Sequence, residues 1–274
     1  MAGHVITLFM KEQGHQVTAF SRHNIDWCNC IVGDVRNSAF LKGCITSGEY
    51  DVVINAIGLL NNAAELNIAD AIYANSYLPH FLSDTTESMT TRVFHMSTDC
   101  VFSGKNGSYT ENDLRDGETV YDRSKALGEL NDSKNLTFRN SIIGPDINEN
   151  GIGLFNWFMR QRQHVSGYAK AIWTGVSTIT LARAMECALR DRVTGIYHLV
   201  NNEAISKYEL ICLFNQYLRN GSVVIQPSDT VHVNKSLVNT RNDFNFVIPS
   251  YSDMVAEIRD WIYSHRSMYP HYDE

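Results

Sequence analysis

The chain has 274 residues, of which 44% are hydrophobic and 19% are charged, and its formal net charge is −7. This length accommodates one large α/β domain or a domain with a smaller lobe. The acidic balance argues against a nucleic-acid partner, which requires clustered lysine and arginine. No apolar run is long enough to cross a membrane, and the N-terminal segment lacks the features of a signal peptide.

The cysteines are scattered and form no Cys-x-x-Cys pair; they are Cys28, Cys30, Cys44, Cys100, Cys187 and Cys212. This scatter is typical of reduced, mostly buried thiols, and it predicts a cytoplasmic protein without a zinc site.

Short apolar runs alternate with helical patterns along the chain. The runs predict strands at 16–20, 30–35, 51–58, 92–96, 136–139, 167–173 and 195–200. The helical patterns predict helices at 5–13, 38–48, 64–86, from 121 onward, and at 181–190, 208–218 and 251–265. Expected N-caps are Ser38, Thr180 and Ser206, the last in a capping box with Glu209. The alternation predicts an α/β fold with a doubly wound parallel sheet.

Candidate chemistry lies between residues 97 and 125. A buried strand ends in Ser97-Thr98-Asp99, and a later helical pattern carries Tyr121 and Lys125, which are four residues apart and share one helix face. A nearby ammonium favours the ionised form of a phenol, as an acid–base tyrosine requires near neutral pH. Such a Tyr/Lys pair is common by chance, but the strand end upstream makes the combination specific.

Together these residues resemble the extended short-chain dehydrogenase/reductases, and most closely the dTDP-4-dehydrorhamnose reductases and related nucleotide-sugar reductases. The resemblance implies a Rossmann domain over 1–145 and a substrate lobe mainly over 146–274, with part of about 170–202 returning to the Rossmann domain. It also implies that the first strand and two glycines of a G-x-x-G-x-x-G turn precede residue 1, which leaves Gly3 as the last glycine.

By the same resemblance the cofactor is NADP or NAD. The residues that would bind it are Gly3, Ser21, Arg22, Asp34, Val35, Ala56, Ile57, Gly58, Asn75, Ser97, Tyr121 and Lys125. Arg22 stands where an acidic residue would select NAD, so a 2′-phosphate and NADP are favoured, with a solvated surface arginine as the alternative. The residues implied to contact the substrate are Asp99, Val101, Phe102, Asn140 and Trp173.

The implied reaction is reduction of a 4-keto nucleotide-diphosphate sugar in the biosynthesis of deoxysugars and cell-surface polysaccharides. Tyr121 would donate the proton, Lys125 would lower its pKa and bind the nicotinamide ribose, and Thr98 would orient the carbonyl. Cys100 stands where related dehydratases carry a glutamate, which disfavours dehydration, whereas epimerisation stays open. A second reading is a non-catalytic, partner-binding protein similar to the regulatory β subunit of methionine adenosyltransferase. The oligomeric state is left open, a homodimer included.

Overall fold

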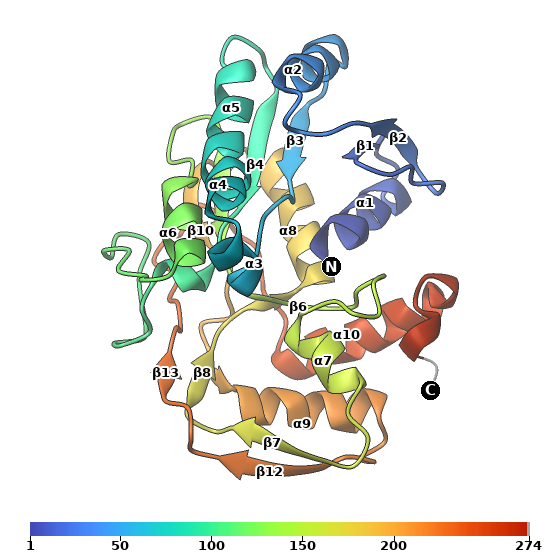
Figure 1. The fold of residues 1–274 in the computed structure, drawn as a ribbon, viewed down its shortest axis with the longest axis vertical. Coiled ribbons are helices and arrows are strands. Elements are labelled where there is room, and N and C mark those ends of the chain that lie inside the picture. Colours follow the sequence, from blue (N-terminus) through green and yellow to red (C-terminus); the bar gives the residue numbers. More distant parts are fainter. Residues whose placement is uncertain (273–274) are drawn as a thin grey trace.

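The computed structural model describes residues 1–272. Its centre is a parallel sheet in the order β10-β5-β4-β3, in agreement with the expected α/β class (Figure 1). Short apolar runs form these strands, which are β3 (Val52–Asn55), β4 (Arg92–Met96), β5 (Leu136–Arg139) and β10 (Gly195–His198). The sequence located β4 and β5 to the residue, because each is a compact apolar run that polar residues follow.

A second parallel pair, β1 (Thr18–Ser21) and β2 (Asn29–Val32), lies beyond β3 and is separate from the main sheet (Figure 1). Within residues 1–272 no backbone pairing joins β1 to β3. All four residues of β1 are only half-buried, whereas those of β5 are buried. The doubly wound arrangement is thus divided into a four-stranded sheet and a two-stranded sheet. Strand β3 forms an open edge of the first sheet, and β1 forms an open edge of the second.

One face of the sheet is covered by α1 (Ala2–Glu12) and α8 (Thr178–Arg190), which pack on each other. Helix α1 ends where Gly14 adopts φ +87°, a conformation that favours glycine. Two expected caps are wrong by a few residues. Asn37 rather than Ser38 caps α2 (Ser38–Ser47), and Ser177 rather than Thr180 caps α8. In each case the residue just before the helix offers the side-chain oxygen to the free N–H groups.

The opposite face is covered by shorter helices: α3 (Asn61–Leu66), α4 (Ile68–Ala71), α5 (Leu78–Thr85) and α6 (Val120–Leu127). The single helix expected over 64–86 is interrupted at Asn67 and again by a π-helical turn, Ile72–Tyr77. Pro79 has no N–H to donate to the carbonyl of Asn75. That carbonyl packs against Gly128 instead, where a Cβ would lie 1.8 Å from its oxygen.

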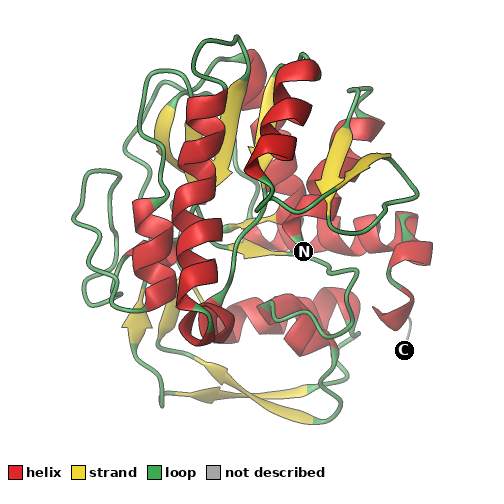
Figure 2. Cartoon of the chain, turned by 45° about the horizontal axis from the view of Figure 1, so that its top comes forward, coloured by secondary structure: helices red, strands yellow, loops and turns green. Residues whose placement is uncertain are grey.

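The remaining chain forms a lobe with small sheets, which Figure 2 shows at the lower edge of the molecule. The paired strands are β6 (Ile142–Ile143) with β9 (Val176–Ser177), β7 (His164–Tyr168) with β12 (Val224–Ser228), and β8 (Ala171–Trp173) with β11 (Ile205–Ser206) and β13 (Val233–Asn234). The helices are α7 (Leu154–Met159), α9 (Lys207–Leu218) and α10 (Tyr251–Ser264), with 3₁₀ turns at Arg266–Met268 and Pro270–Tyr272. A further 3₁₀ turn, Asp99–Val101, lies outside the lobe, directly after β4.

One prediction for this lobe and one for the cysteines of the whole chain are corrected, and one for the lobe is confirmed. The strand expected over 167–173 is two strands, β7 and β8, because the chain turns at Ala169 and Lys170. The six cysteines are free, but all are half-buried rather than fully buried. The capping box of Ser206 and Glu209 is present at the start of α9. Among residues 1–272, no helix is both long enough and apolar enough to cross a membrane.

Candidate active site at the end of strand β4

The end of β4 places three polar residues, Ser97, Thr98 and Asp99, in the interior, each less than 10% exposed. Thr98 is extended and caps a short 3₁₀ turn. Its hydroxyl accepts a hydrogen bond from the Cys100 N–H at 3.1 Å and donates to Asp99 Oδ1 at 3.0 Å. These bonds fix the Thr98 hydroxyl at the carboxyl end of the sheet, where open α/β sheets bind their ligands.

Helix α6 brings the predicted tyrosine to this hydroxyl. A capping box between Thr119 and Asp122 starts the helix at Val120, so Tyr121 lies in its first turn and Lys125 in its last. The Tyr121 hydroxyl is hydrogen-bonded to the side chain of Thr98. Thr98 acts to lower the pKa of Tyr121, as a hydroxyl that hydrogen-bonds to the phenol oxygen does. The structure therefore brings Thr98 and Tyr121 together.

The Lys125 ammonium group lies deeper than the phenol. Lys125 is 4% exposed, and its Nζ lies 2.5 Å from the carbonyl oxygen of Met96 and 3.2 Å from Nε2 of His95. Burial lowers the pKa of Lys125 to about 8, and Glu129 opposes this shift. The direct partners of this lysine are thus neutral groups of β4.

The pKa of Tyr121 moves in the direction opposite to the expected one. Burial raises it above the usual range, the Cys100 and Asp99 side chains add to the rise, and the bond with Thr98 opposes it. Burial therefore outweighs the predicted lowering by Lys125, whose Nζ contacts Met96 and His95. A tyrosine in this environment is a protonated phenol at neutral pH, which suits a proton donor.

The pKa values of two side chains beside the phenol are also raised. Burial raises the pKa of Asp99, although the positive charge of Lys235 opposes the shift. Burial and the neighbouring Asp99 raise the pKa of the Cys100 thiol to about 12. A thiol of that pKa is not a general base near neutral pH.

The predicted cofactor residues at the end of β3 meet the start of α1. A Cβ on Gly3 would lie 3.6 Å from the Cβ of Ala56. Ile57 and Gly58 continue the exposed exit of β3, and a Cβ on Gly58 would lie 3.2 Å from Oδ1 of Asn75. The N-terminus of α1 therefore stands beside a turn of small residues, an arrangement that suits a phosphate group.

Asn75 connects this turn to helix α6. Its Oδ1 accepts from the Leu59 N–H at 2.8 Å, and its Nδ2 donates to the Leu59 carbonyl at 2.9 Å and to Ser124 Oγ at 3.0 Å. The family resemblance predicts that this asparagine supports the site. The buried Asn75 amide, with the three hydrogen bonds given above, matches such a role.

The remaining predicted cofactor residues lie at the ends of β1 and β2. Arg22 is exposed directly after Ser21. The Asp34 carboxylate accepts from the Arg36 N–H at 2.9 Å, and the Val35 carbonyl accepts from the Tyr73 hydroxyl at 2.8 Å. These residues are separated from Tyr121 by the open edge between β1 and β3.

The predicted substrate residues divide into three groups. Val101 and Phe102 are fully buried in an apolar cluster with Tyr109, Val200 and Leu237, so the structure does not support a contact between their side chains and a substrate. Asp99 lies at the site through its bond with Thr98. Asn140 is 2% exposed at the end of β5, and neither its Oδ1 nor its Nδ2 has a hydrogen-bond partner.

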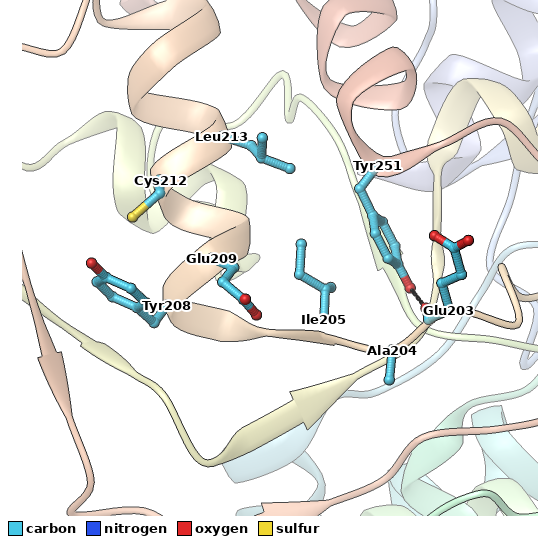
Figure 3. A pocket seen from close by; sticks show the side chains of 8 residues that line it. All are labelled: Glu203, Ala204, Ile205, Tyr208, Glu209, Cys212, Leu213 and Tyr251. Atoms are coloured by element: carbon cyan, nitrogen blue, oxygen red, sulfur yellow. Dashed lines mark hydrogen bonds between the residues drawn. The ribbon is translucent and has the colours of Figure 1, made fainter.

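Trp173, the last of the predicted substrate residues, is buried in the lobe. Its ring lies 5.7 Å from the ring of Tyr251. Tyr251 lines an open hollow of about 470 Å³ between α9 and α10, and Figure 3 shows its hydroxyl directed at the main chain of Glu203. The lining of this hollow contains none of the predicted catalytic residues. Arg241, a candidate cationic partner for a diphosphate, is already bonded to Asp243 and to two carbonyl groups.

Sequence reasoning missed His95 and the pair of Glu129 and Arg139. His95 is a polar residue inside an otherwise apolar strand, and this irregularity is the signal that could have identified it. Glu129 and Arg139 form a fully buried ion pair behind Ser97. Within residues 1–272, no cluster of histidine, cysteine, aspartate or glutamate is placed to hold a metal ion.

Comparisons with known proteins identify the relatives of this arrangement. Residues 1–244 match the family described as the RmlD substrate binding domain. A dTDP-4-dehydrorhamnose reductase of Aggregatibacter actinomycetemcomitans is 26% identical over 196 residues, which are 67% of this chain and 67% of that protein.

Solved structures show the same fold. The dTDP-4-dehydrorhamnose reductase of Bacillus anthracis in complex with NADP superposes with a TM-score of 0.72 at 17% identity, and the match covers 88% of this chain and 97% of that chain. The Bordetella bronchiseptica enzyme WbmG in complex with NAD and UDP superposes with a TM-score of 0.76 at 15% identity, covering 97% and 92%.

Proposed function

Because the chain belongs to the RmlD substrate binding domain family, we propose that it is an NAD(P)H-dependent reductase of a 4-keto nucleotide-diphosphate sugar. The observation that carries this proposal is the buried pair of Thr98 and Tyr121, in which burial raises the pKa of the phenol and keeps it protonated. Such a phenol is ready to give a proton to a carbonyl oxygen that is being reduced.

The residues of the first half fit a nicotinamide dinucleotide. The N-terminus of α1 beside Gly3 and Ala56 would hold the pyrophosphate, and Lys125 would reach the ribose next to the nicotinamide. The buried Asn140 amide, which has no protein partner, offers a donor and an acceptor to a bound group. When bound, the reduced nicotinamide supplies the hydride.

The chain's own residues supply the proton and the orientation of the substrate. A carbonyl oxygen that takes the place of Thr98 Oγ1 at the phenol receives the Tyr121 proton as negative charge develops on it. The Thr98 hydroxyl, which now donates to Asp99, can turn its hydrogen to the same oxygen. The Cys100 thiol, whose pKa is about 12, cannot act as a base at this position. The arrangement therefore favours reduction over an elimination that needs a base.

The test measures oxidation of NADPH with a 4-keto nucleotide sugar for the wild-type chain and for Tyr121→Phe. Loss of the phenolic proton donor is expected to reduce kcat by about 10²–10⁴-fold, while the titration of cofactor fluorescence with protein stays unchanged. Tyr77→Phe is the matched control, because Tyr77 is 48% exposed on the neighbouring π-helical turn. If Tyr121→Phe turns over at the wild-type rate, Tyr121 is not the proton donor.

A further inference from the structure

Two lysines of the lobe, Lys207 and Lys235, are half-buried and carry charges that no protein group compensates. Each of the other lysines within residues 1–272 is either exposed or hydrogen-bonded. Neither ammonium group has a hydrogen bond or an ion pair with another described residue. A half-buried ammonium group loses part of its hydration, so an unpaired charge there is costly. The two lysines therefore indicate an anionic ligand.

The three-stranded sheet of the lobe places the two lysines on either side of its central strand, β8. Ser206, the residue before Lys207, pairs with Ile172 of β8 from strand β11. Asn234, the residue before Lys235, pairs with the same Ile172 from strand β13. Two strand spacings, roughly 10 Å, therefore separate Ser206 from Asn234. The flexible four-carbon stems of two lysines can converge on one ligand across this distance.

Main-chain hydrogen bonds hold Lys235 against the loop that follows the end of β4. The Asn234 N–H donates to the Gly104 carbonyl oxygen at 2.8 Å. The Tyr109 N–H donates to the Ser236 carbonyl oxygen at 2.9 Å. A Cβ on Gly104, whose φ is +82°, would lie 2.8 Å from Cγ of Lys235. The stem of this lysine therefore packs directly on the loop that leaves the candidate active site.

Lys207 is the first residue of α9, where the nearby carboxylate of Glu209 is already engaged. Glu209 accepts from the Ser206 N–H at 2.9 Å and from the Ser206 hydroxyl at 2.7 Å, which completes the capping box. This carboxylate is thus held at the cap and forms no ion pair with Lys207. The positive end of the α9 dipole lies at the same place and adds to the attraction for an anion.

The charges of both lysines act on the residues at the end of β4. The positive charge of Lys235, and less strongly that of Lys207, opposes the rise in the pKa of Asp99. Lys235 also opposes the rise in the pKa of the Cys100 thiol. Such effects require proximity, because salt screens charges that are more than about 10 Å apart. The two ammonium groups therefore lie near the candidate active site, on its lobe side.

We propose that Lys207 and Lys235 bind the diphosphate group of the nucleotide-sugar substrate and direct its sugar toward Thr98 and Tyr121. The role in the reaction rests on the proposed function. The two negative charges of such a diphosphate match two ammonium groups, and lysine binds phosphate oxygens as a point charge. The cofactor pyrophosphate has the same chemistry, but the residues that would hold it lie at the start of α1, whereas both lysines belong to the lobe.

The test is a calorimetric titration of the full chain with dTDP and with UDP, in the presence of saturating NADPH. Lys207→Met and Lys235→Met should each weaken binding of these nucleotides by roughly 10–100-fold, as expected for the loss of one charged hydrogen bond. Lys235→Arg keeps the charge and should bind nearly as tightly as the wild type. Lys42→Met, at an exposed lysine of α2, is the matched control and should not change the affinity.

Two results would overturn the inference: equal nucleotide affinity of the wild type and both methionine variants, or no binding of dTDP or UDP to the wild type. A separate titration with NADPH distinguishes the two sources of diphosphate. Weaker NADPH binding in the variants, with unchanged binding of dTDP and UDP, would assign the lysines to the cofactor and contradict the proposal. Because no turnover is measured, lysine-dependent nucleotide binding by a chain without reductase activity would contradict the proposed function alone.

Discussion

Glu129→Gln tests whether the buried ion pair behind the active site holds the end of β4 in place. The Glu129 side chain is fully buried and accepts two parallel bonds from Arg139, each at 2.8 Å. It also accepts from Ser97 Oγ at 2.6 Å and from Arg115 at 3.0 Å. The substitution keeps the shape of the side chain but turns one acceptor into a donor that faces other donors.

The expected loss of stability is large because Arg139 cannot reach water. Arg139 is 1% exposed, and its other contacts are His198 Nε2 at 2.8 Å, the Glu111 carbonyl oxygen at 3.3 Å and the ring of Phe102 at 5.1 Å. Removing one partner of a buried pair costs about 3–5 kcal/mol, since the other charge stays buried without compensation. That is a substantial part of the 5–15 kcal/mol by which domains are usually stable, as a rough guide.

Urea unfolding at pH 7, followed by circular dichroism, measures this loss. The double variant Glu129→Gln/Arg139→Met should be more stable than Glu129→Gln alone, because it removes the uncompensated charge as well. Glu118→Gln is the control, since its partner Lys105 and Glu118 itself are exposed, and its midpoint should stay near that of the wild type. A Glu129→Gln midpoint equal to that of the control would refute the reasoning.

The same pair has a defined dependence on pH. Burial acts to raise the pKa of Glu129, but the bonds from Arg139 and Ser97 outweigh it and hold the pKa below the usual value. Folding therefore gains stability above the unfolded pKa of about 4.3, and this gain is lost as the pH falls through the lower folded pKa. Glu129→Gln should show a weaker loss of stability in this acid range than the wild type.

Three further predictions concern Lys125, Gly128 and Arg22. Lys125→Met should abolish NADPH-dependent reduction. It should also raise the free energy of unfolding at pH 7 by on the order of 1–3 kcal/mol, because the pKa of the buried lysine is lowered in the folded state. The stability of the wild type should correspondingly rise between pH 8 and about pH 10.4, and a fall would contradict the lowered pKa. Gly128→Ala should lower the free energy of unfolding in urea by about 1–3 kcal/mol, because the new Cβ would meet the Asn75 carbonyl. Gly43→Ala in α2 is the control and should be neutral or stabilising, because nothing lies within 4 Å of its Cβ position. Equal effects of the two substitutions would refute the close approach of Gly128 to Asn75. Arg22→Ala should weaken NADPH binding about tenfold in a fluorescence titration and leave NADH binding unchanged, and a parallel loss of both would remove Arg22 as the 2′-phosphate partner.

Patterns that depend on local chemistry could be predicted from the sequence, and patterns that depend on contacts across the fold could not. The strand at 92–96 and the capping box of Ser206 and Glu209 follow from residues close together in the chain. The interruption at Ile72–Tyr77 has the same apolar periodicity as a continuous helix. There Pro79 offers no N–H to the Asn75 carbonyl, which packs against the distant Gly128. Likewise, the apolar residues after Thr98 have no mark that distinguishes a site from a core, and Val101 lies in the core.

The pair of Tyr121 and Lys125 shows why spacing alone predicts proximity but not charge. Tyr121 and Lys125 share one face of α6, as their separation of four residues requires. Side chains alternate along β4, so Phe94 packs in the main core whereas Val93 packs in the cluster with Leu78 and Leu82 of α5. His95 is on the Val93 side and meets Lys125 there. Burial on that face raises the pKa of Tyr121 and lowers that of Lys125, so both groups move toward their neutral forms. A protonated phenol is a proton donor rather than a phenolate base, and reduction of a carbonyl needs such a donor.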